Sequence, residues 1–386
     1  MEGGKSYGIL FMLFLLPCIL AAQQPRLMLP VGHSFEIMSV QFSPDGKKIL
    51  TTSMDYTAKM WDAASGYLLT EFKQHRQWVK TAAFSADGRK LVTASADSTA
   101  IVWDAVSGQV LKTLRHQSRV EHVAFSPDGK KILTITHSRQ YSFWDTEKGT
   151  IIPDFLPVEG GKAEDVRFSP DGKYVLTRID GMVQVWDVFR KAHIADLGIN
   201  AMGPNIESAC FSKDGKKILA AADSGSVFLW DINRKVTIKD EEGYPVETLR
   251  ANRIIKHSTD RLTDAQFSPA EDRAYTKSPD QKVGIWQTAT GKQLAELPVF
   301  ADERTFVQIS PNGKILLTAN EFELPMLWDA FTGKLLDSCN SEKKVMQRGI
   351  AAFSPDGSKI ISATDYYVSI WDGNTGKLQG ILNDRQ

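Results

Sequence analysis

The pattern of apolar and polar residues repeats about every 42 positions along this chain. In residues 38–42, large apolar residues alternate with small or polar ones, and this period of two predicts a half-buried β-strand. The turn Ser-Pro-Asp-Gly follows at 43–46, where proline presets φ and glycine accepts a positive φ. Three further strand-like segments, at 48–52, 57–61 and 67–72, are separated by turn signals. The unit therefore predicts four antiparallel strands, here called a to d in chain order.

This unit recurs eight times, and a tryptophan marks the end of each strand c. The tryptophans are Trp61, Trp103, Trp144, Trp186, Trp230, Trp286, Trp328 and Trp371, with spacings of 42, 41, 42, 44, 56, 42 and 43 residues. A single unit would expose two apolar faces, so we expect the units to stack around an axis. The sequence thus predicts an all-β fold, a β-propeller of four-stranded antiparallel blades, most simply with eight blades.

Two segments compete to close the predicted ring. Residues 26–31 precede the first unit and residues 376–382 follow the last tryptophan, and both have the pattern of a strand d. In the usual closure the N-terminal strand completes the last blade and removes an exposed edge. Alternatively, the C-terminal strand takes that place. A seven-bladed ring with an appended unit, or the front piece of a longer protein, is a third interpretation.

The N-terminus differs from the rest of the chain. Lys5 precedes an apolar run over residues 9–22, which ends in Ala21 and Ala22, as in a secretory signal peptide. A run of about 14 residues is short for a membrane span. We therefore expect residues 1–22 to be a cleaved signal peptide and residues 23–386 to form the propeller. The expected location is secreted or periplasmic, and the alternative is a membrane anchor formed by an uncleaved N-terminus.

Composition and motifs argue against several classes of function. The 46 Lys and Arg residues balance the 46 Asp and Glu residues, so no global charge favours nucleic acid or a membrane surface. Cys210 and Cys339 stand at non-equivalent positions in two different units, which favours two buried thiols over a disulfide framework. The histidines lack metal-ligand spacing, and no glycine-rich phosphate loop is present. We expect no metal and no cofactor.

Several motifs of the unit resemble those of the WD40-repeat family. The likeness rests on Gly32-His33, Ser43-Pro44-Asp45-Gly46, Asp55 and Trp61-Asp62, and it extends over residues 27–386. In that family a His, a strand-b hydroxyl, a turn Asp and the strand-c Trp form a hydrogen-bonded tetrad. The resemblance implies two such tetrads: His33, Thr51 or Ser53, Asp55 and Trp61; and His75, Thr93 or Ser95, Asp97 and Trp103. The chain looks like a secreted WD40 propeller of bacterial type.

Later units depart from the tetrad pattern. The third has His116 but Ser138 in place of the Asp, and the fourth keeps Asp180 without the His. Because His, Ser or Thr and Asp recur in several copies, we interpret them as buried structural networks. A catalytic triad would be one special set with an exposed nucleophile. No catalytic residue is therefore expected.

The long spacing before Trp286 indicates a candidate partner site. From Trp230 to Phe267 the chain runs 37 residues, against 22 to 25 in the other units. If the family topology holds, much of this segment emerges at the rim or on the face formed by the d–a connections and b–c turns, where such propellers commonly bind partners. Insertions in repeat proteins often lie on the binding face. Aromatic residues there are the expected contacts: Tyr244, Phe322, Tyr366 and Tyr367.

We therefore expect a non-catalytic scaffold that binds a protein or peptide and no nucleic acid. One alternative is a sensor or recruitment module of a larger hydrolase or protease that this chain lacks. A minor alternative is a quinoprotein-like dehydrogenase, because 328–334 and 371–377 resemble the Asp-x-x-Thr-Gly-Lys turn of that family. There a tryptophan follows the turn, whereas here it precedes it. Cofactor absorbance in the purified protein would decide this point.

Overall fold

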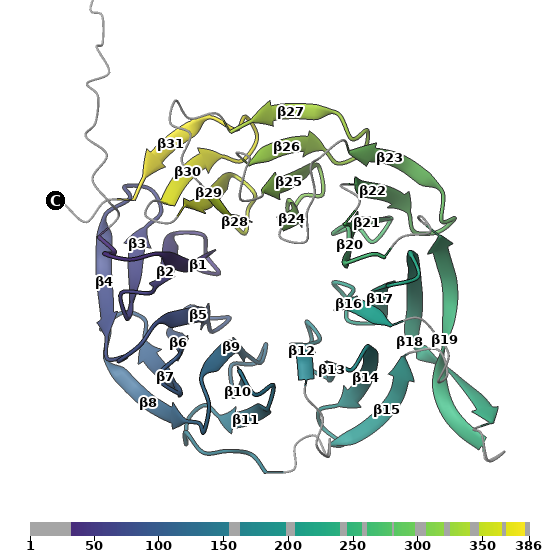
Figure 1. Cartoon of the computed structure of the whole chain (residues 1–386), viewed down its shortest axis with the longest axis horizontal. Helices are drawn as coiled ribbons and strands as arrows, with labels where there is room; N and C mark the ends of the chain where they lie inside the picture. Colours follow the sequence, from purple (N-terminus) through teal and green to yellow (C-terminus); the bar gives the residue numbers. More distant parts are fainter. Residues whose placement is uncertain are drawn as a thin grey trace, which may run out of the picture.

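The computed structural model describes residues 32–153, 163–197, 205–239, 245–256, 261–279, 282–297, 306–319, 325–339, 347–364 and 368–382. Their strands form eight separate antiparallel sheets around a central axis (Figure 1). Within each sheet the strands follow chain order from the axis outward, so each repeat is one blade. The predicted eight-bladed β-propeller is therefore confirmed, and a seven-bladed ring with an appended unit is excluded.

The first four blades comprise these strands: β1 (Ile37–Phe42), β2 (Lys48–Ser53), β3 (Thr57–Asp62) and β4 (Leu68–Lys73); β5 (Val79–Phe84), β6 (Lys90–Ser95), β7 (Thr99–Asp104) and β8 (Val110–Arg115); β9 (Val120–Phe125), β10 (Lys131–Thr136) and β11 (Tyr141–Asp145); β12 (Ala163–Phe168), β13 (Tyr174–Ile179), β14 (Met182–Asp187) and β15 (Ala192–Leu197). Within the described residues the third blade has three strands, and its fourth position holds one bridge between Trp144 and Ile151.

The last four blades comprise these strands: β16 (Ile206–Phe211), β17 (Lys217–Ala222), β18 (Ser226–Lys239) and β19 (Pro245–Lys256); β20 (Asp264–Phe267), β21 (Arg273–Ser278), β22 (Lys282–Gln287) and β23 (Gln293–Leu297); β24 (Phe306–Ile309), β25 (Ile315–Ala319), β26 (Met326–Asp329) and β27 (Leu335–Ser338); β28 (Gln347–Phe353), β29 (Lys359–Thr364), β30 (Val368–Asp372) and β31 (Leu378–Ile381). No helix of the described chain is long and apolar enough to cross a membrane.

The hydrophobic core is divided among the interfaces between blades. Between blades one and two, Leu50, Met60 and Phe72 pack against Leu91 and Trp103. Seven similar clusters fill the other interfaces, each with the strand-c tryptophan of one blade facing its neighbour. A buried tryptophan contributes about 3–5 kcal/mol relative to alanine, so each of the eight tryptophans makes a large contribution to its interface.

The Ser-Pro-Asp-Gly turns hold strands a and b in register. In the first blade the Ser43 hydroxyl donates to the Asp45 carboxylate at 2.5 Å and accepts the Lys48 amide at 2.9 Å. Gly46 has a φ of 69°, a left-handed conformation that glycine adopts without the strain of a Cβ atom. The same Ser, Asp or Asn, and Gly arrangement recurs in most blades. These turns therefore stabilise the pairing of strands a and b.

The ring closes between the last and the first blade. β31 pairs with β30 as the fourth strand of blade eight, so the C-terminal segment takes the place that the usual closure assigns to an N-terminal strand. Residues 26–31, the competing segment, lie outside the described residues. One apolar cluster joins the two blades, and it includes Ile37 and Trp61 from blade one and Ile370 from blade eight. Across this interface the Lys359 ammonium donates to the Ala63 carbonyl at 2.6 Å.

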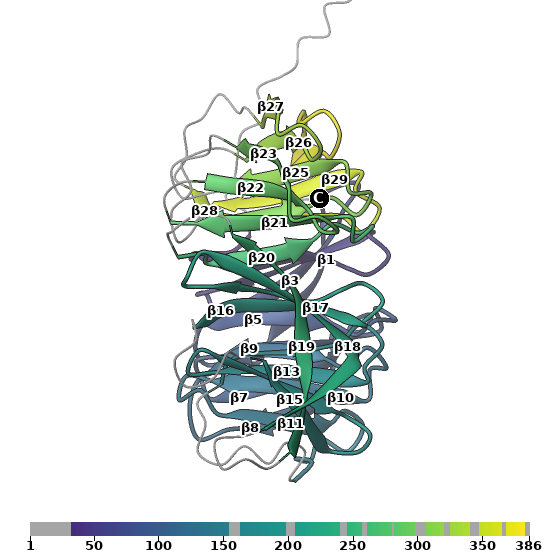
Figure 2. The same cartoon turned by 90° about the vertical axis from the view of Figure 1, so that its right-hand side faces the viewer.

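The oversize spacing before Trp286 forms a long ribbon. β18 and β19 pair from Ser226 and Lys256 out to Lys239 and Pro245, with register shifts near Trp230. This ribbon extends the c–d hairpin of blade five beyond the rim (Figures 1 and 2). Of the two places expected for the extra residues, the rim is therefore correct, and the face of the d–a connections and b–c turns is wrong. They lengthen strands c and d, whose turn lies at the opposite end of the antiparallel sheet.

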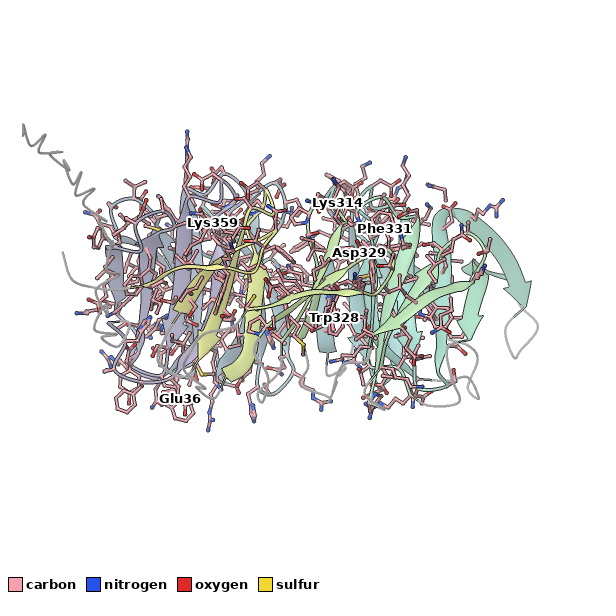
Figure 3. All side chains as sticks on the ribbon, turned by 90° about the horizontal axis from the view of Figure 1, so that it is seen from above. Glu36, Lys314, Trp328, Asp329, Phe331 and Lys359 are labelled. Carbon is pink, nitrogen blue, oxygen red and sulfur yellow. The ribbon has the colours of Figure 1, made fainter. Side chains whose placement is uncertain are left out.

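The propeller thus has two distinct faces. One contains the d–a connections and b–c turns, and we call it the d–a/b–c face. The other contains the a–b and c–d turns, and we call it the a–b/c–d face. Figure 3 shows the disk edge on, with Glu36, in the segment that enters β1, at the d–a/b–c face. Lys314, Phe331 and Lys359 lie at the opposite face.

Candidate partner-binding face

A buried chain of hydrogen bonds links the d–a/b–c face to the core of the first blade. His33 Nδ1 lies 2.8 Å from the Asp55 carboxylate, and His33 Nε2 lies 2.7 Å from the Thr51 hydroxyl. The Trp61 indole donates to the same hydroxyl at 2.9 Å. Of the two hydroxyls that the sequence left open, Thr51 joins the chain, whereas Ser53 donates to the Phe35 carbonyl.

The second blade contains the same arrangement. His75 lies 3.0 Å from the Asp97 carboxylate and 2.7 Å from the Thr93 hydroxyl, and the Trp103 indole donates to Thr93 at 2.9 Å. Here Ser95 donates to the Gln77 carbonyl. In both blades the hydroxyl between His and Trp is fully buried. A buried hydroxyl cannot reach a substrate, so the geometry is that of a structural network and not of a nucleophilic triad.

The charges in the first network follow from its hydrogen bonds. Burial alone would raise the pKa of the Asp55 carboxyl, but the hydrogen bond and charge of His33 and the hydrogen bonds from Thr57 lower it to about 2. Burial lowers the pKa of the His33 imidazole, although its bond to Asp55 opposes that effect. At neutral pH the network therefore joins an ionised carboxylate to a neutral imidazole.

The third blade lacks the carboxylate, as its sequence indicates. His116 Nε2 lies 2.9 Å from the Thr134 hydroxyl, which also accepts the Trp144 indole at 2.9 Å. His116 Nδ1 is buried and meets no hydrogen-bond partner among the described residues. Ser138, at the position of the Asp, bonds instead to Thr136 at 2.9 Å. In blades four, six, seven and eight, the bond from tryptophan to a strand-b hydroxyl also occurs: Trp186 to Thr177, Trp286 to Thr276, Trp328 to Thr318 and Trp371 to Ser362.

Beside these networks, the b–c turns hold large side chains in a strained conformation. Tyr56 and Arg139 have φ angles of 73° and 62°, the left-handed region that favours glycine. Blade five has Gly225 at the equivalent position, with a φ of 71°. Left-handed non-glycine residues cost on the order of 1 kcal/mol and concentrate at functional sites. Ser98 has a φ of 65° at the equivalent position of blade two, so the left-handed conformation is a regular feature of these b–c turns, and blades one and three place a tyrosine and an arginine there.

Three aromatic side chains project from the part of this face formed by the first two blades. Phe35 is 60% exposed, Tyr56 46% and Trp78 39%. The backbone around them is fixed: the Met54 amide donates to the Glu36 carbonyl and the Ala96 amide to the Trp78 carbonyl, both at 2.9 Å. Aromatic residues held on rigid backbone are typical anchors for a protein partner.

A polar cavity of about 410 Å³ lies on the same face, where blades three to six meet. Apart from Ile135 and Thr136, its lining residues are ionisable: Glu121, His122, His137, Arg139, Arg178, Glu207 and Arg261. Glu121 lies 3.6 Å from Lys80, and the Lys80 ammonium lies 5.6 Å from the centre of the Trp78 ring. Lys80 therefore connects Trp78 to the wall of this cavity.

The opposite face offers a less continuous apolar surface. Its most exposed large apolar side chains, Val106, Phe189 and Phe331, come from the c–d turns of blades two, four and seven. Phe331 is covered by the Arg273 guanidinium, whose carbon lies 3.5 Å from the ring centre. Side chains scattered in this way are common on protein surfaces and do not by themselves mark an interface.

The four contacts expected from the sequence, Tyr244, Phe322, Tyr366 and Tyr367, lie outside the described residues. The three exposed aromatic residues Phe35, Tyr56 and Trp78 were not expected. One signal in the sequence could have revealed part of it, because Trp78 is the single tryptophan outside the eightfold series.

Chemistry by thiols or metals finds no support in the described part of the chain. Cys210 and Cys339 are free, and burial raises the pKa of both thiols to about 12, so neither forms a thiolate at neutral pH. Among the described residues, no group of three or more His, Cys, Asp or Glu side chains is arranged to hold a metal ion.

Comparison with known proteins identifies the repeats. Residues 36–254, more than half of the chain, match the family model described as the IFT122 first beta-propeller. Residues 336–372 match the model of the WD domain, G-beta repeat. Among solved structures, the computationally designed Ika8 protein superimposes with a TM-score of 0.69 and 23% identity, over 88% of this chain and 97% of that chain. At this identity the likeness concerns the fold.

Two curated proteins show partial similarity. Pre-mRNA-processing factor 19 of Bos taurus is 27% identical over 155 residues, which cover 40% of this chain and 30% of that protein. Eukaryotic translation initiation factor 3 subunit I of Aspergillus terreus is 29% identical over 104 residues, covering 27% of this chain and 30% of that protein. The chain thus spans less than a third of the length of these relatives.

Proposed function

Because the chain belongs to the IFT122 first-propeller family of WD40-repeat β-propellers, we propose that it is a non-catalytic scaffold that binds a protein or peptide partner. Propellers of the WD40 type are typically interaction scaffolds, and the buried networks described above offer no exposed nucleophile. The partner binds on the d–a/b–c face. The carrying observation is that blades one and two present three exposed aromatic side chains on that face: Phe35, Tyr56 and Trp78.

The backbone geometry supports this choice of face. The two loops of blade one that carry Phe35 and Tyr56 are joined by the hydrogen bond from Met54 to Glu36. A partner that packs on these rings would therefore order few residues, which lowers the entropic cost of binding. The b–c turn fixes Tyr56 in a left-handed conformation, with a φ of 73°, so the position of its backbone is also well defined.

Affinity capture from the native host, quantified by mass spectrometry, tests this proposal. The double variant Tyr56→Gly with Trp78→Ala removes two anchors, and Tyr56→Gly also relieves backbone strain. The matched control is Phe189→Ala, which removes an aromatic residue that is 79% exposed on the opposite face. We expect the double variant to lose a captured partner by about tenfold or more, as for hot-spot residues. Capture lost equally in the control, or unchanged in the double variant, would contradict the proposal.

We also propose that the scaffold acts outside the cytoplasm, because residues 1–22 have the pattern of a cleaved signal peptide. N-terminal sequencing of the protein from fractionated native cells tests this. A mature N-terminus near Gln23 in the exported fraction supports export. An intact Met1 in the cytoplasmic fraction argues against it.

A further inference from the structure

We infer that the inner wall of the ring, where blades four to seven meet, holds a binding site for a small organic carboxylate with an apolar body. This site goes beyond the proposed function and does not depend on it. A cavity of about 570 Å³ lies along the strands a of these blades, which are the innermost strands of their sheets (Figure 1). Lys213, Pro269 and Pro311 in its lining belong to a–b turns, so the cavity reaches the a–b/c–d face. Its volume is typical of small-molecule sites.

Much of the lining of this inner-wall cavity is apolar. Phe211, Phe267 and Phe306 contribute aromatic rings from three successive blades, and all three side chains are partly exposed. Val307 and the two prolines add further apolar surface. Each methylene group that a ligand buries here contributes about 0.8 kcal/mol. The cavity therefore favours a ligand with an apolar or aromatic body.

Several polar side chains of the lining are already used to hold the blades together. Three of them, at one register position of strand a, bond to the backbone of the next innermost strand: the Gln266 amide donates to the Val307 carbonyl at 3.1 Å, the Cys210 thiol donates to the Ala265 carbonyl at 3.4 Å, and the Gln308 oxygen accepts the Phe353 amide at 3.0 Å. The Ser268 hydroxyl is buried and donates to Asp272 within its own turn. The two cations of the lining, Arg167 and Lys213, remain to be explained.

Arg167 occupies the same register position in blade four but makes a different contact. It pairs with Leu176 of strand b, as Gln266 pairs with Tyr275 in blade six. Its Nε donates to the Asp165 carboxylate of its own strand at 2.7 Å, and its side chain is 51% exposed. Among the described residues, neither terminal nitrogen of this guanidinium forms a hydrogen bond. These nitrogens can therefore donate to a ligand in a bidentate manner.

Lys213 is a second departure from the repeat, in a different element. At this position of the a–b turn, six of the eight units have a proline: Pro44, Pro127, Pro170, Pro269, Pro311 and Pro355. Lys213 is exposed and forms no ion pair with the described part of the chain. Two cations that depart from the repeat, one in a strand and one in a turn, thus line the same cavity from adjacent blades. Neither bonds to a neighbouring blade, so packing of the ring does not account for them.

The chemistry of the lining indicates the class of ligand. A planar guanidinium binds a carboxylate through two parallel hydrogen bonds, and the phenylalanine rings accept the apolar body. Asp165 lies beside Arg167, and its negative charge would repel a doubly charged phosphate more strongly than a singly charged carboxylate. We therefore expect a monocarboxylate that carries an aromatic or other apolar group.

Calorimetric titration of the whole chain with three probes tests the inference: naphthylacetate, its neutral amide naphthylacetamide, and acetate. Naphthylacetate should bind about tenfold or more tightly than the amide, because only the carboxylate forms charge-assisted bonds. It should exceed acetate by about tenfold or more, because acetate has no apolar body to bury. A tripeptide that ends in phenylalanine with a free carboxylate distinguishes two sources of this chemistry. If it binds more tightly than naphthylacetate, the ligand is a chain end, and if it binds more weakly, the ligand is a free small molecule.

Matched variants assign the binding to the cavity. Arg167→Gln introduces the residue that Gln41, Gln266 and Gln308 already provide at this register position, so it should fold, and it should weaken naphthylacetate by about tenfold. Lys213→Pro restores the usual turn residue and should weaken naphthylacetate by about threefold. The control is Lys216→Gln, an exposed lysine of the same turn that does not line the cavity, which should leave binding unchanged. Urea midpoints of all three variants check that the fold is retained.

Three results would overturn the inference. The first is equal binding of naphthylacetate and its amide, and the second is equal binding of naphthylacetate and acetate. The third is naphthylacetate binding that is unchanged in both Arg167→Gln and Lys213→Pro. The double variant Tyr56→Gly with Trp78→Ala separates this site from the proposed partner-binding face. It should bind naphthylacetate as the wild type does, and a loss of binding there would place the ligand on the d–a/b–c face and contradict the inference.

Discussion

Replacing Ser138 by aspartate tests whether the network of blade three lacks only a carboxylate. In blades one and two an aspartate at this turn position lies 2.8 and 3.0 Å from the histidine Nδ1. In blade three, His116 Nδ1 is buried without a hydrogen-bond partner among the described residues. We expect Ser138→Asp to supply that partner and to stabilise the folded protein.

The magnitude follows from the groups involved. A hydrogen bond to a charged acceptor contributes about 1.5–3 kcal/mol, and satisfying a buried polar atom removes a penalty of similar size. Against this stand the desolvation of the new carboxylate and the loss of the 2.9 Å bond between Ser138 and Thr136. The net gain should be about 1–2 kcal/mol, which corresponds to roughly a tenfold change in an opening equilibrium.

Two measurements check this expectation. The midpoint of urea unfolding should rise without a change in slope. Exchange of the Trp144 indole N–H, which is bonded to Thr134 in the same network, should slow by about tenfold if exchange follows local opening. Asp55→Ser, which makes blade one resemble blade three, should lower the midpoint. An unchanged midpoint and exchange rate, or equal stabilisation by Ser138→Asp in a His116→Ala background, would refute the reasoning.

Three further predictions concern pH, ring closure and strain. Stability should fall as the pH drops below about 6.5, where unfolded but not folded His33 takes up a proton. It should fall again from about 3.8 toward 2, because unfolded Asp55 takes up a proton in this range while the folded carboxyl stays ionised until about pH 2, and Asp55→Asn should flatten this second step in urea titrations. Lys359→Met removes the 2.6 Å bond to Ala63. It should lower the free energy of unfolding by about 1 kcal/mol, measured as a lower urea midpoint. Lys314→Met, at an exposed turn of the same face (Figure 3), should leave the midpoint unchanged. Tyr56→Gly should raise thermal stability by about 1 kcal/mol while partner capture falls, and a loss of stability would show that no strain is present at that turn.

The repeat pattern predicted the architecture because strand period, turn chemistry and tryptophan spacing are all local. The hydroxyl of the first network was not settled in the same way. Thr51 and Ser53 are two residues apart, so both point to the same side of strand b. Pairing decides between them: β2 and β3 align Thr51 with Lys59, near Trp61, while Ser53 lies at the turn.

The long segment and the binding face were harder to predict. Spacing shows that extra residues follow Trp230, but it does not show whether they lengthen a hairpin or a connection. The structure extends β18 and β19. The cavity joins residues from four blades, and no local pattern brings Arg139, Arg178 and Arg261 together. Tyr56 gave no signal either, because its left-handed φ depends on the turn and not on its own side chain.

Because of the way the ring closes, one of its interfaces should separate first when the chain is pulled. Seven of the eight interfaces are crossed by the continuous chain, whereas the described interface between β31 and the first blade is held by side-chain packing and the bond from Lys359 to Ala63. The strands that enter and leave the ring lie beside this interface (Figure 1). A tensile force applied at both ends of the chain would therefore part blades eight and one first, and would leave the other seven contacts shielded until the ring had opened.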